Sequence, residues 1–483
     1  MRRAALTTVA LFVALTSAYA QPPMFITPPA PRYSDTERQA ELARRRDAVG
    51  AKMADNSLLI LLSAEPKIYT NDVDYAFRQE NNLYYLSNLK QKGSILVLSK
   101  KGGKVSEFVF IPRPNPATET WNGHMYSTAE AAAISGIKDI REAGAWAPYL
   151  MNVEHKATSG YTTVYMLQRL PENEEDPQGD REYRRENLLS KRFVGYKLED
   201  PYPIFAALRQ VKSPYEQKML QHAIDISTEA HERAWLAAGS AKMEYELQAE
   251  VEYSFRKRNA DYWGYPSIVG CGPNATTLHY EESQGPVLKN GLCLMDVGAE
   301  YDHYSADVTR TFPVSGKFSK EQAEIYQIVY DAQEAVARAA KPGASVLELS
   351  SAAESVIKEG LFKLGLITKI DSLQYQIYYM HDYGHWLGLN VHDIGTRWAL
   401  APGMTFTNEP GVYVRSDALE HLPDTPENRV FKEKVRPAFE KYKNIGVRIE
   451  DDMLVTDTGV RWMTAALPRK MSDIEAFIAA NTK

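Results

Sequence analysis

Short apolar runs and longer amphipathic stretches alternate along the chain, and their spacing predicts both strands and helices. In the first part of the chain, the runs typical of strands are 57–62, 94–99 and 107–111, and the stretches typical of helices are 36–54 and 128–134. Strands that alternate with helices are typical of an α/β domain. We therefore predict a smaller α/β domain at the N-terminus, over 21–200.

Helix-capping signals mark the second part of the chain. Capping boxes occur at 213–216 and 319–322, where a serine and a Glu or Gln three positions later can bond each other's backbone N–H groups. A third helix is predicted at 346–364, and strand-like runs lie between and after these helices. We therefore predict an α+β domain over 201–483.

The first twenty residues have the pattern of a secretory signal peptide. An arginine pair precedes an apolar run at 4–14, and the tripeptide at 18–20 has the small-x-small pattern of a cleavage site. A membrane anchor is the alternative, but the run is too short to span a bilayer comfortably. We expect removal of 1–20 and a mature protein that is periplasmic or secreted, without membrane attachment.

Charge and cysteine content narrow the class of protein further. The formal net charge is −6, and no basic tract is present, which argues against a nucleic-acid partner. The charged, proline-punctuated stretch 171–187 predicts a solvated loop. Cys271 and Cys293 are the two cysteines, both in apolar runs. We expect two free buried thiols, with a disulfide as the alternative in an exported protein.

Four acids and one histidine in the second part of the chain stand in short apolar segments. They are Asp296, Asp307, His385, Glu409 and Glu450. Burying several like charges together costs many kcal/mol unless cations neutralise them. Two divalent metal ions would do so, and a paired-metal site is suited to hydrolysis. Oxygen ligands with one imidazole favour Mn²⁺, Co²⁺, Fe²⁺ or Zn²⁺.

The four acids are expected within strands or at their ends. Asp296 ends an apolar strand, and a hairpin would place Asp307, in the next strand, beside it. Glu409 stands where a strand meets a turn, and Glu450 ends a strand and opens an acidic run. Because strand side chains alternate, one acid of that run can point inward while its neighbour faces solvent.

Several motifs together resemble those of a known family. In the second part, LCLMDVG, YSADVTRTF, HDYGHWLGLNVHD, FTNEPGVYV and GVRIEDD occur in order, after RQVKSPYE at 209–216. In the first part, the corresponding motifs are RRRDAVGAKM, YAFRQENNLYYLSN and ETWNGHMYS. The chain resembles the Xaa-Pro peptidases of the pita-bread fold, most closely aminopeptidase P and next prolidase. This resemblance implies an α+β pita-bread catalytic domain after the smaller N-terminal domain.

The resemblance also assigns the metal ligands. Asp296 would bind one metal ion, Asp307 and Glu450 would bridge both, and His385 and Glu409 would hold the second. A water or hydroxide between the ions would be the nucleophile, and Glu409 would shuttle its proton. Mn²⁺ is the favoured ion, with Co²⁺, Zn²⁺ and Fe²⁺ as alternatives.

Five further residues match positions around the family's substrate. His279 and His392 would contact the scissile carbonyl and the proline side, which stabilises the developing oxyanion. His381 would line the proline pocket. Tyr413 and Arg448 would support the site, with Arg448 anchoring a metal-bound aspartate.

The expected function is release of the N-terminal residue from peptides with proline in second position, by a homo-oligomer, dimeric or tetrameric. The alternatives are a dipeptidase restricted to Xaa-Pro dipeptides and a non-catalytic pita-bread binding protein. The stretch 414–444 is longer and more charged than in compact members. It is predicted to be a surface insertion, and the alternative is that it narrows the entrance to the site.

Overall fold

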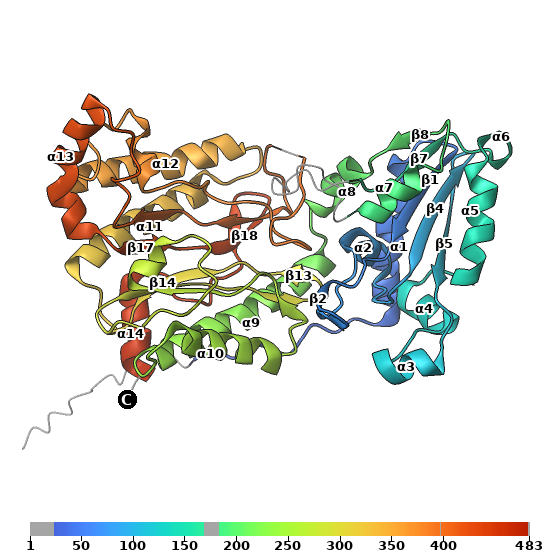
Figure 1. Cartoon of the computed structure of the whole chain (residues 1–483), viewed down its shortest axis with the longest axis horizontal. Helices are drawn as coiled ribbons and strands as arrows, with labels where there is room; N and C mark the ends of the chain where they lie inside the picture. The colour runs from blue at the N-terminus through green and yellow to red at the C-terminus, as the bar shows by residue number, and fades with distance from the viewer. Residues whose placement is uncertain (1–23, 169–182, 397, 482–483) are drawn as a thin grey trace, which may run out of the picture.

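The structure is a computed structural model that describes residues 24–168, 183–396 and 398–481. It has two domains side by side, the N-terminal one in blue and cyan and the C-terminal one in green to red (Figure 1). The predicted signal peptide and most of the predicted loop at 171–187 lie outside the described residues. The end of that loop was predicted wrongly, because helix α7 begins at Arg184.

The N-terminal domain is built on a six-stranded mixed sheet in the order β6-β5-β4-β1-β7-β8. Its strands are β1 (Ser57–Leu62), β4 (Ile95–Lys101), β5 (Lys104–Ile111), β6 (Asp139–Glu142), β7 (Thr163–Tyr165) and β8 (Lys197–Glu199). A small hairpin of β2 (Ile68–Thr70) and β3 (Val73–Asp74) stands apart from it. Every residue of β1 is buried, as expected for an inner strand with both faces covered.

Short helices surround this sheet. They are α1 (Asp35–Lys52), α2 (Asn81–Ser87), α3 (Pro116–Asn122), α4 (Thr128–Ser135), the 3₁₀ turn η1 (Ala143–Ala145), α5 (Trp146–Glu154), α6 (Lys156–Ser159), α7 (Arg184–Ser190) and α8 (Tyr202–Arg209). Helices α1 and α4 begin at capping boxes, on Ser34 and Ser127.

The C-terminal domain packs long helices against small antiparallel sheets. The helices are α9 (Pro214–Ala238), α10 (Glu244–Lys257), η2 (Gly272–Thr276), α11 (Lys320–Ala339), α12 (Val346–Leu364), η3 (Leu373–Ile377), α13 (Pro426–Tyr442) and α14 (Met471–Asn481). The strands are β9 (Tyr262–Trp263), β10 (Ile268–Cys271), β11 (Leu292–Asp296), β12 (Ala299–Tyr301), β13 (Tyr304–Ser305), β14 (Thr309–Pro313), β15 (Thr405–Asn408), β16 (Gly411–Val414), β17 (Ile445–Arg448), β18 (Asp451–Val455) and β19 (Val460–Trp462). The mixture confirms the predicted α+β class.

The capping boxes of this domain are confirmed. Ser213 and Ser319 each cap a helix, and each donates its backbone N–H to the side chain three residues later. Helix α12 has the predicted bounds. These ends were predictable because the cap is a local interaction that needs no tertiary contact.

The two cysteines form a disulfide, so the prediction of free thiols was wrong. Cys271 on β10 and Cys293 on β11 are directly paired across the antiparallel ladder. Both runs were correctly expected to be apolar strands, but their register, which brings the two sulfur atoms together, is a tertiary property.

The chain touches the C-terminal domain before it enters the N-terminal one. Thr27 donates from its backbone N–H and its hydroxyl to Glu229 of α9, at 2.8 and 2.6 Å. Phe25 donates its backbone N–H to Glu232 of the same helix. The lead then runs on to α1, so a segment of the C-terminal domain's surface is covered by the start of the chain.

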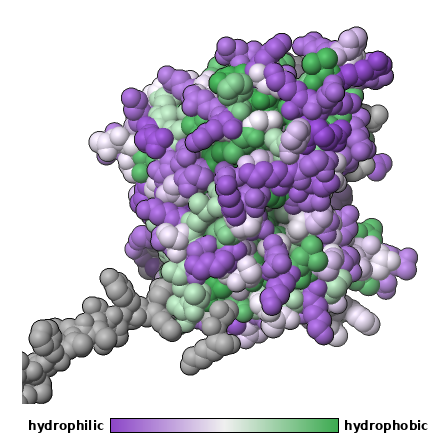
Figure 2. Space-filling model, turned by 90° about the vertical axis from the view of Figure 1, so that its left-hand side faces the viewer, coloured by the Kyte–Doolittle hydropathy of each residue, from purple (hydrophilic) through white to green (hydrophobic). Residues whose placement is uncertain are grey.

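The surface at the C-terminal-domain end carries mostly hydrophilic side chains, with hydrophobic ones scattered between them (Figure 2). Within the described residues, none of the helices has the length and apolarity that crossing a bilayer requires.

Candidate active site

Four connections of the C-terminal domain bring the predicted ligands together. Asp296 is the last residue of β11, which pairs with β14 so that Asp296 faces Thr309. Asp307 lies two residues before β14, in the connection from β13, and not within a strand as predicted. Both carboxylates line the same cavity nevertheless, because β11 and β14 are neighbours and the β12–β13 hairpin forms the connection between them.

The two glutamates come from a second pair of connections. Glu409 stands in the turn between β15 and β16, and Glu450 in the link between β17 and β18, both as predicted. Asn408 faces Asp451 across the β15–β18 ladder, which places the two turns at one edge. The backbone N–H of Glu450 donates to Thr309 at 3.0 Å and joins this edge to β14.

Three of the five predicted ligands are close enough together to hold one metal ion. His385 Nε2 lies 3.2 Å from an oxygen of Asp307 and 3.2 Å from an oxygen of Glu409. Asp307, His385 and Glu450 offer ligand atoms that all lie within 4.8 Å of one another. All five predicted ligands line one cavity of about 410 Å³.

Hydrogen bonds fix the orientation of three of these carboxylates. Thr309 donates to Glu450 at 2.6 Å, Thr407 donates to Glu409 at 3.0 Å, and the Tyr265 hydroxyl donates to Asp296. The sequence analysis missed all three donors. Only Thr407 left a signal, since it lies two residues before Glu409 and therefore on the same face of the strand.

A second chain of contacts runs from Asp296 to the histidines. Arg448 donates to Asp296 at 2.5 Å and to the Tyr413 hydroxyl at 2.8 Å. That hydroxyl lies 2.9 Å from Nε2 of His381. Tyr413 is fully buried and does not line the cavity, whereas Arg448 and His381 do. Tyr413 therefore supports these two side chains from behind.

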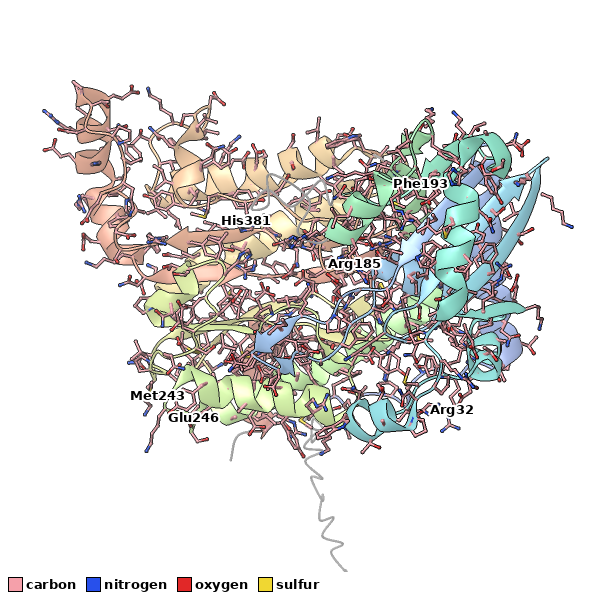
Figure 3. The ribbon with its side chains drawn as sticks, turned by 45° about the vertical axis from the view of Figure 1, so that its right-hand side comes forward. Arg32, Arg185, Phe193, Met243, Glu246 and His381 are labelled. Carbon is pink, nitrogen blue, oxygen red and sulfur yellow. A yellow bond between two sulfur atoms is a disulfide. The ribbon has the colours of Figure 1, made fainter. Side chains whose placement is uncertain are left out.

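The predicted histidines surround the ligands. His279, His381 and His392 all line the cavity, and the rings of His392 and His385 are 4.2 Å apart between centroids. His381 lies beneath α12 (Figure 3), whose Ser350 bonds the adjacent Asp382. Among the described residues, the lining includes none from 414–444. Helix α13, which fills most of that stretch, lies at the end of the molecule away from the N-terminal domain (Figure 1), against the idea that it narrows the entrance.

Electrostatics at the site show an excess of buried negative charge. Burial raises the pKa of Asp307, Glu409 and Glu450, and repulsion between their carboxylates adds to the shift. Burial alone would lower the pKa of His385, but its contacts with Asp307 and Glu409 raise it to about 9. In effect the imidazolium serves as the cation that these carboxylates require.

The acidic run after Glu450 departs from the prediction. Asp451 does not face solvent: it is buried and accepts from Arg310 at 2.6 Å and from Gln333 at 2.7 Å, because α11 covers that face of β18. Asp452 is also fully buried, and burial followed by repulsion from Asp307 raises its pKa. One of its oxygens has no hydrogen-bond partner.

These residues fit divalent cations. Oxygen donors with one imidazole are a hard ligand set, held by neighbouring hydroxyls and a guanidinium as metal ligands usually are. The raised pKa of the carboxylates marks a shortage of positive charge, which cations would supply.

His381 and His392, which are not predicted ligands, have lowered pKa values. Desolvation in the cavity, followed by repulsion from His385 and His279, lowers the pKa of His392 to about 4. Burial lowers the pKa of His381 as well. Both rings are therefore neutral near pH 7 and can donate or accept a hydrogen bond to a neutral peptide group.

Comparison with known proteins places this site in a family. Residues 218–457 match the metallopeptidase family M24, and residues 42–162 match the N-terminal domain of aminopeptidase P. The chain is 34% identical to the Xaa-Pro aminopeptidase of Haemophilus influenzae, over 90% of this chain and 96% of that one. It is 32% identical to the Xaa-Pro aminopeptidase of Escherichia coli, over 93% and 100% of the two chains.

The fold agrees with solved structures of such enzymes. Aminopeptidase P from E. coli in its low-pH form superimposes with a TM-score of 0.81 at 30% identity, covering 93% of this chain and 99% of that chain. A zinc-substituted form of the E. coli enzyme with bound product gives 0.80 at 29% identity, with coverage of 94% and 100%. The C-terminal domain thus has the pita-bread fold that the resemblance implied. The cluster of predicted metal ligands, the fold and the relatives all indicate the same family. The chain belongs to the metallopeptidase family M24, with an aminopeptidase P N-terminal domain.

Proposed function

We propose that this metallopeptidase releases the N-terminal residue from peptides that carry proline in second position. The observation that carries the proposal is the convergence of Asp296, Asp307, His385, Glu409 and Glu450 on one cavity. The naming of its relatives as Xaa-Pro aminopeptidases supports the choice of substrate. Proline gives such a site its purpose, because the bond before it lacks the N–H that general proteases bind.

Two divalent ions, Mn²⁺ being favoured, would be held by these five side chains and would supply a water nucleophile of lowered pKa and a polarised carbonyl. The remaining work falls to the chain itself. Glu409, steadied by Thr407 at 3.0 Å, takes the proton from the nucleophile and passes it to the leaving amine. Asp296 is kept in place by Arg448.

The imidazole groups that line the cavity suit the substrate's peptide groups. His392 and His279 line the cavity beside the ligands and would donate to the scissile carbonyl as negative charge develops on it. His381, backed by the Tyr413 hydroxyl, would form a wall against the proline ring. A neutral ring avoids repulsion of the cations that the carboxylates attract.

The test compares Ala-Pro with Ala-Pro-Ala as substrates, before and after chelation and with Mn²⁺ restored. We expect hydrolysis of the tripeptide at the first bond, its loss with chelator and its return with the metal. Cleavage of the dipeptide alone would establish the dipeptidase instead, and hydrolysis that survives chelation would overturn the metal mechanism. Ala-Gly-Ala serves as the control that should not be cleaved.

We also propose that the protein is exported. The predicted leader at 1–20 and the Cys271–Cys293 disulfide support this, because disulfides persist in oxidising compartments. Sequencing the N-terminus of the protein from fractionated cells tests it, and a start at Gln21 is expected. The homo-oligomer stays a prediction that light scattering can check.

A further inference from the structure

One side chain of the N-terminal domain reaches two of the segments that carry predicted metal ligands. Arg78, in the loop between β3 and α2, donates from Nε to Glu300 at 2.6 Å. Its terminal nitrogens donate to the backbone oxygen of Leu389 at 2.7 Å, to that of His303 at 3.3 Å and to the side chain of Asn81 at 2.7 Å. In Figure 1 the dark blue β2–β3 hairpin next to this loop lies between the two domains.

The first segment that Arg78 holds is the β12–β13 hairpin. Glu300 and His303 belong to it, and the hairpin is the connection between Asp296 and Asp307. Glu300 is buried, so its bond with Arg78 is shielded from competing water on one side. A displacement of the hairpin would move the ends of β11 and β14, where both aspartates sit.

The second segment is the stretch that carries the histidines. Leu389 lies four residues after His385 and three residues before His392. The two segments also touch directly, since the backbone N–H of Ser305 donates to Gly388 at 2.9 Å. The guanidinium therefore binds each segment between two residues of the site.

Two residues near Arg78 contact the same two segments, the β12–β13 hairpin and the histidine segment. Asn81 donates to Asn390 at 2.8 Å, next to Leu389. The ring of Tyr84 stacks on that of His303 with centroids 3.7 Å apart, and its hydroxyl donates to Asp302. The N-terminal domain thus contacts the hairpin and the histidine segment through the loop and helix that contain Arg78.

We propose that Arg78 is a positioning residue for the metal centre, holding the aspartate hairpin and the histidine segment at a fixed spacing. Without cations the carboxylates of Asp296 and Asp307, on either side of the hairpin, repel each other, and that repulsion favours movement of the hairpin. A planar guanidinium with donors in a fixed fork resists such separation better than a flexible ammonium. Holding the ligands in place beforehand lowers the cost of binding the ions.

The experiment measures metal binding and not turnover. Arg78→Ala, Arg78→Lys and the control Arg192→Ala are stripped of metal and titrated with Co²⁺ by calorimetry, and the visible spectrum of the Co²⁺ form is recorded. Arg192 is a matched control because it pairs with Glu154 inside the N-terminal domain, at 2.8 Å. We expect about 10- to 100-fold weaker binding and an altered spectrum for Arg78→Ala, as for other residues that orient ligands. Arg78→Lys should recover part of the loss, and Arg192→Ala should match the wild type.

Unchanged Co²⁺ affinity and spectrum in Arg78→Ala would overturn the proposal, even if its melting temperature falls, because the contact would then only join two domains. Should that variant fail to fold, Glu300→Gln keeps the shape and removes the charge that Arg78 binds. Weaker Co²⁺ binding in Glu300→Gln supports the proposal, and wild-type binding overturns it. No peptide enters these measurements, so their outcome is separate from that of the proposed substrate.

Discussion

Two buried charge clusters in this protein reach opposite electrostatic states. Asp393, in the connection between η3 and β15, accepts from Arg209 and from Lys212, the latter at 3.1 Å, and all three are buried. Burial by itself would raise the pKa of Asp393, but the two cations lower it below its usual value. This carboxylate is ionised and needs nothing further.

In the predicted metal site, burial has the other outcome. The pKa of Asp307, of Glu409 and of Glu450 is raised, because the neighbouring carboxylates outnumber the cations within reach. Asp393, Asp307 and Glu450 are all buried, so burial alone does not distinguish the two clusters. The number of positive charges near the carboxylates does distinguish the clusters. A shortage of such charges indicates a site that can bind metal ions.

Replacing Asp307 by asparagine should have the largest effect. Asparagine keeps the shape but removes a shared anionic ligand, so we expect kcat/KM for the Xaa-Pro tripeptide to fall by at least roughly 1000-fold. The metal-free variant should unfold at a temperature no lower than the wild type, because one repelling charge is gone. Activity assays and thermal unfolding of the stripped protein measure both. Retained hydrolysis would refute the ligand assignment.

Removing the charge of Asp393 tests the satisfied cluster. Asp393→Asn leaves Arg209 and Lys212 buried without a counter-charge, which should cost about 3–5 kcal/mol in the free energy of unfolding. Urea unfolding of the stripped protein measures it. Asp139→Asn is the control, since its pair with Arg141 is half exposed and should cost under about 1 kcal/mol. Equal losses in the two variants would remove the contrast drawn above.

A substitution at Thr309 tests the orientation of a predicted ligand without changing its charge. Thr309→Val removes the 2.6 Å bond to Glu450, and we expect roughly tenfold weaker metal binding. Thr311→Val is a close control on the same strand, because that buried hydroxyl bonds the backbone of Arg448 at 3.0 Å and touches none of the five ligands. Calorimetric titration with Co²⁺ compares them. Equal weakening in both would point to a general effect on β14.

The smallest expected effect is a change in the stability of the metal-free protein with pH. Asp307, Glu409 and Glu450 have folded-state pKa values above the unfolded value of about 4, so the folded state binds more protons. Stability from these groups is present below that value and is lost as pH rises towards the raised pKa. His385 acts in the same direction, because its pKa of about 9 exceeds the unfolded value of about 6.5.

The rise in melting temperature on adding Co²⁺ should therefore be greater at pH 8 than at pH 6, by about 2–4 °C. Scanning calorimetry with and without the ion at each pH gives the difference. The Asp307→Asn variant should show a smaller dependence. A metal-induced shift that is equal at both pH values would show that the carboxylates are already ionised without ions.

Many helices and strands could be predicted because their signals are local in the sequence. The serine of each capping box and its partner three residues later located the starts of α9 and α11, and apolar periodicity gave α12. Glu409 and Glu450 were placed at strand ends because a polar residue that interrupts an apolar run is visible without tertiary information. The convergence of the ligands came from family motifs rather than from any spacing.

What failed depended on contacts between distant segments. The register of β10 and β11 decides that Cys271 meets Cys293, and helix α11 decides that Asp451 is buried instead of solvated. Tyr265 and Thr309 are ordinary strand-region residues until β11 and β14 bring them to Asp296 and Glu450. A single sequence contains no local signal for such pairings.

The lead at 24–27 has a consequence for how the two domains can move. Thr27 is hydrogen-bonded to Glu229 on α9, and the chain returns to α9 after α8. The N-terminal domain is therefore attached to the C-terminal domain at both of its ends. A rotation of one domain relative to the other about a single hinge would have to break the hydrogen bond between Thr27 and Glu229. With both attachments intact, the two domains form a frame that resists bending about a single hinge.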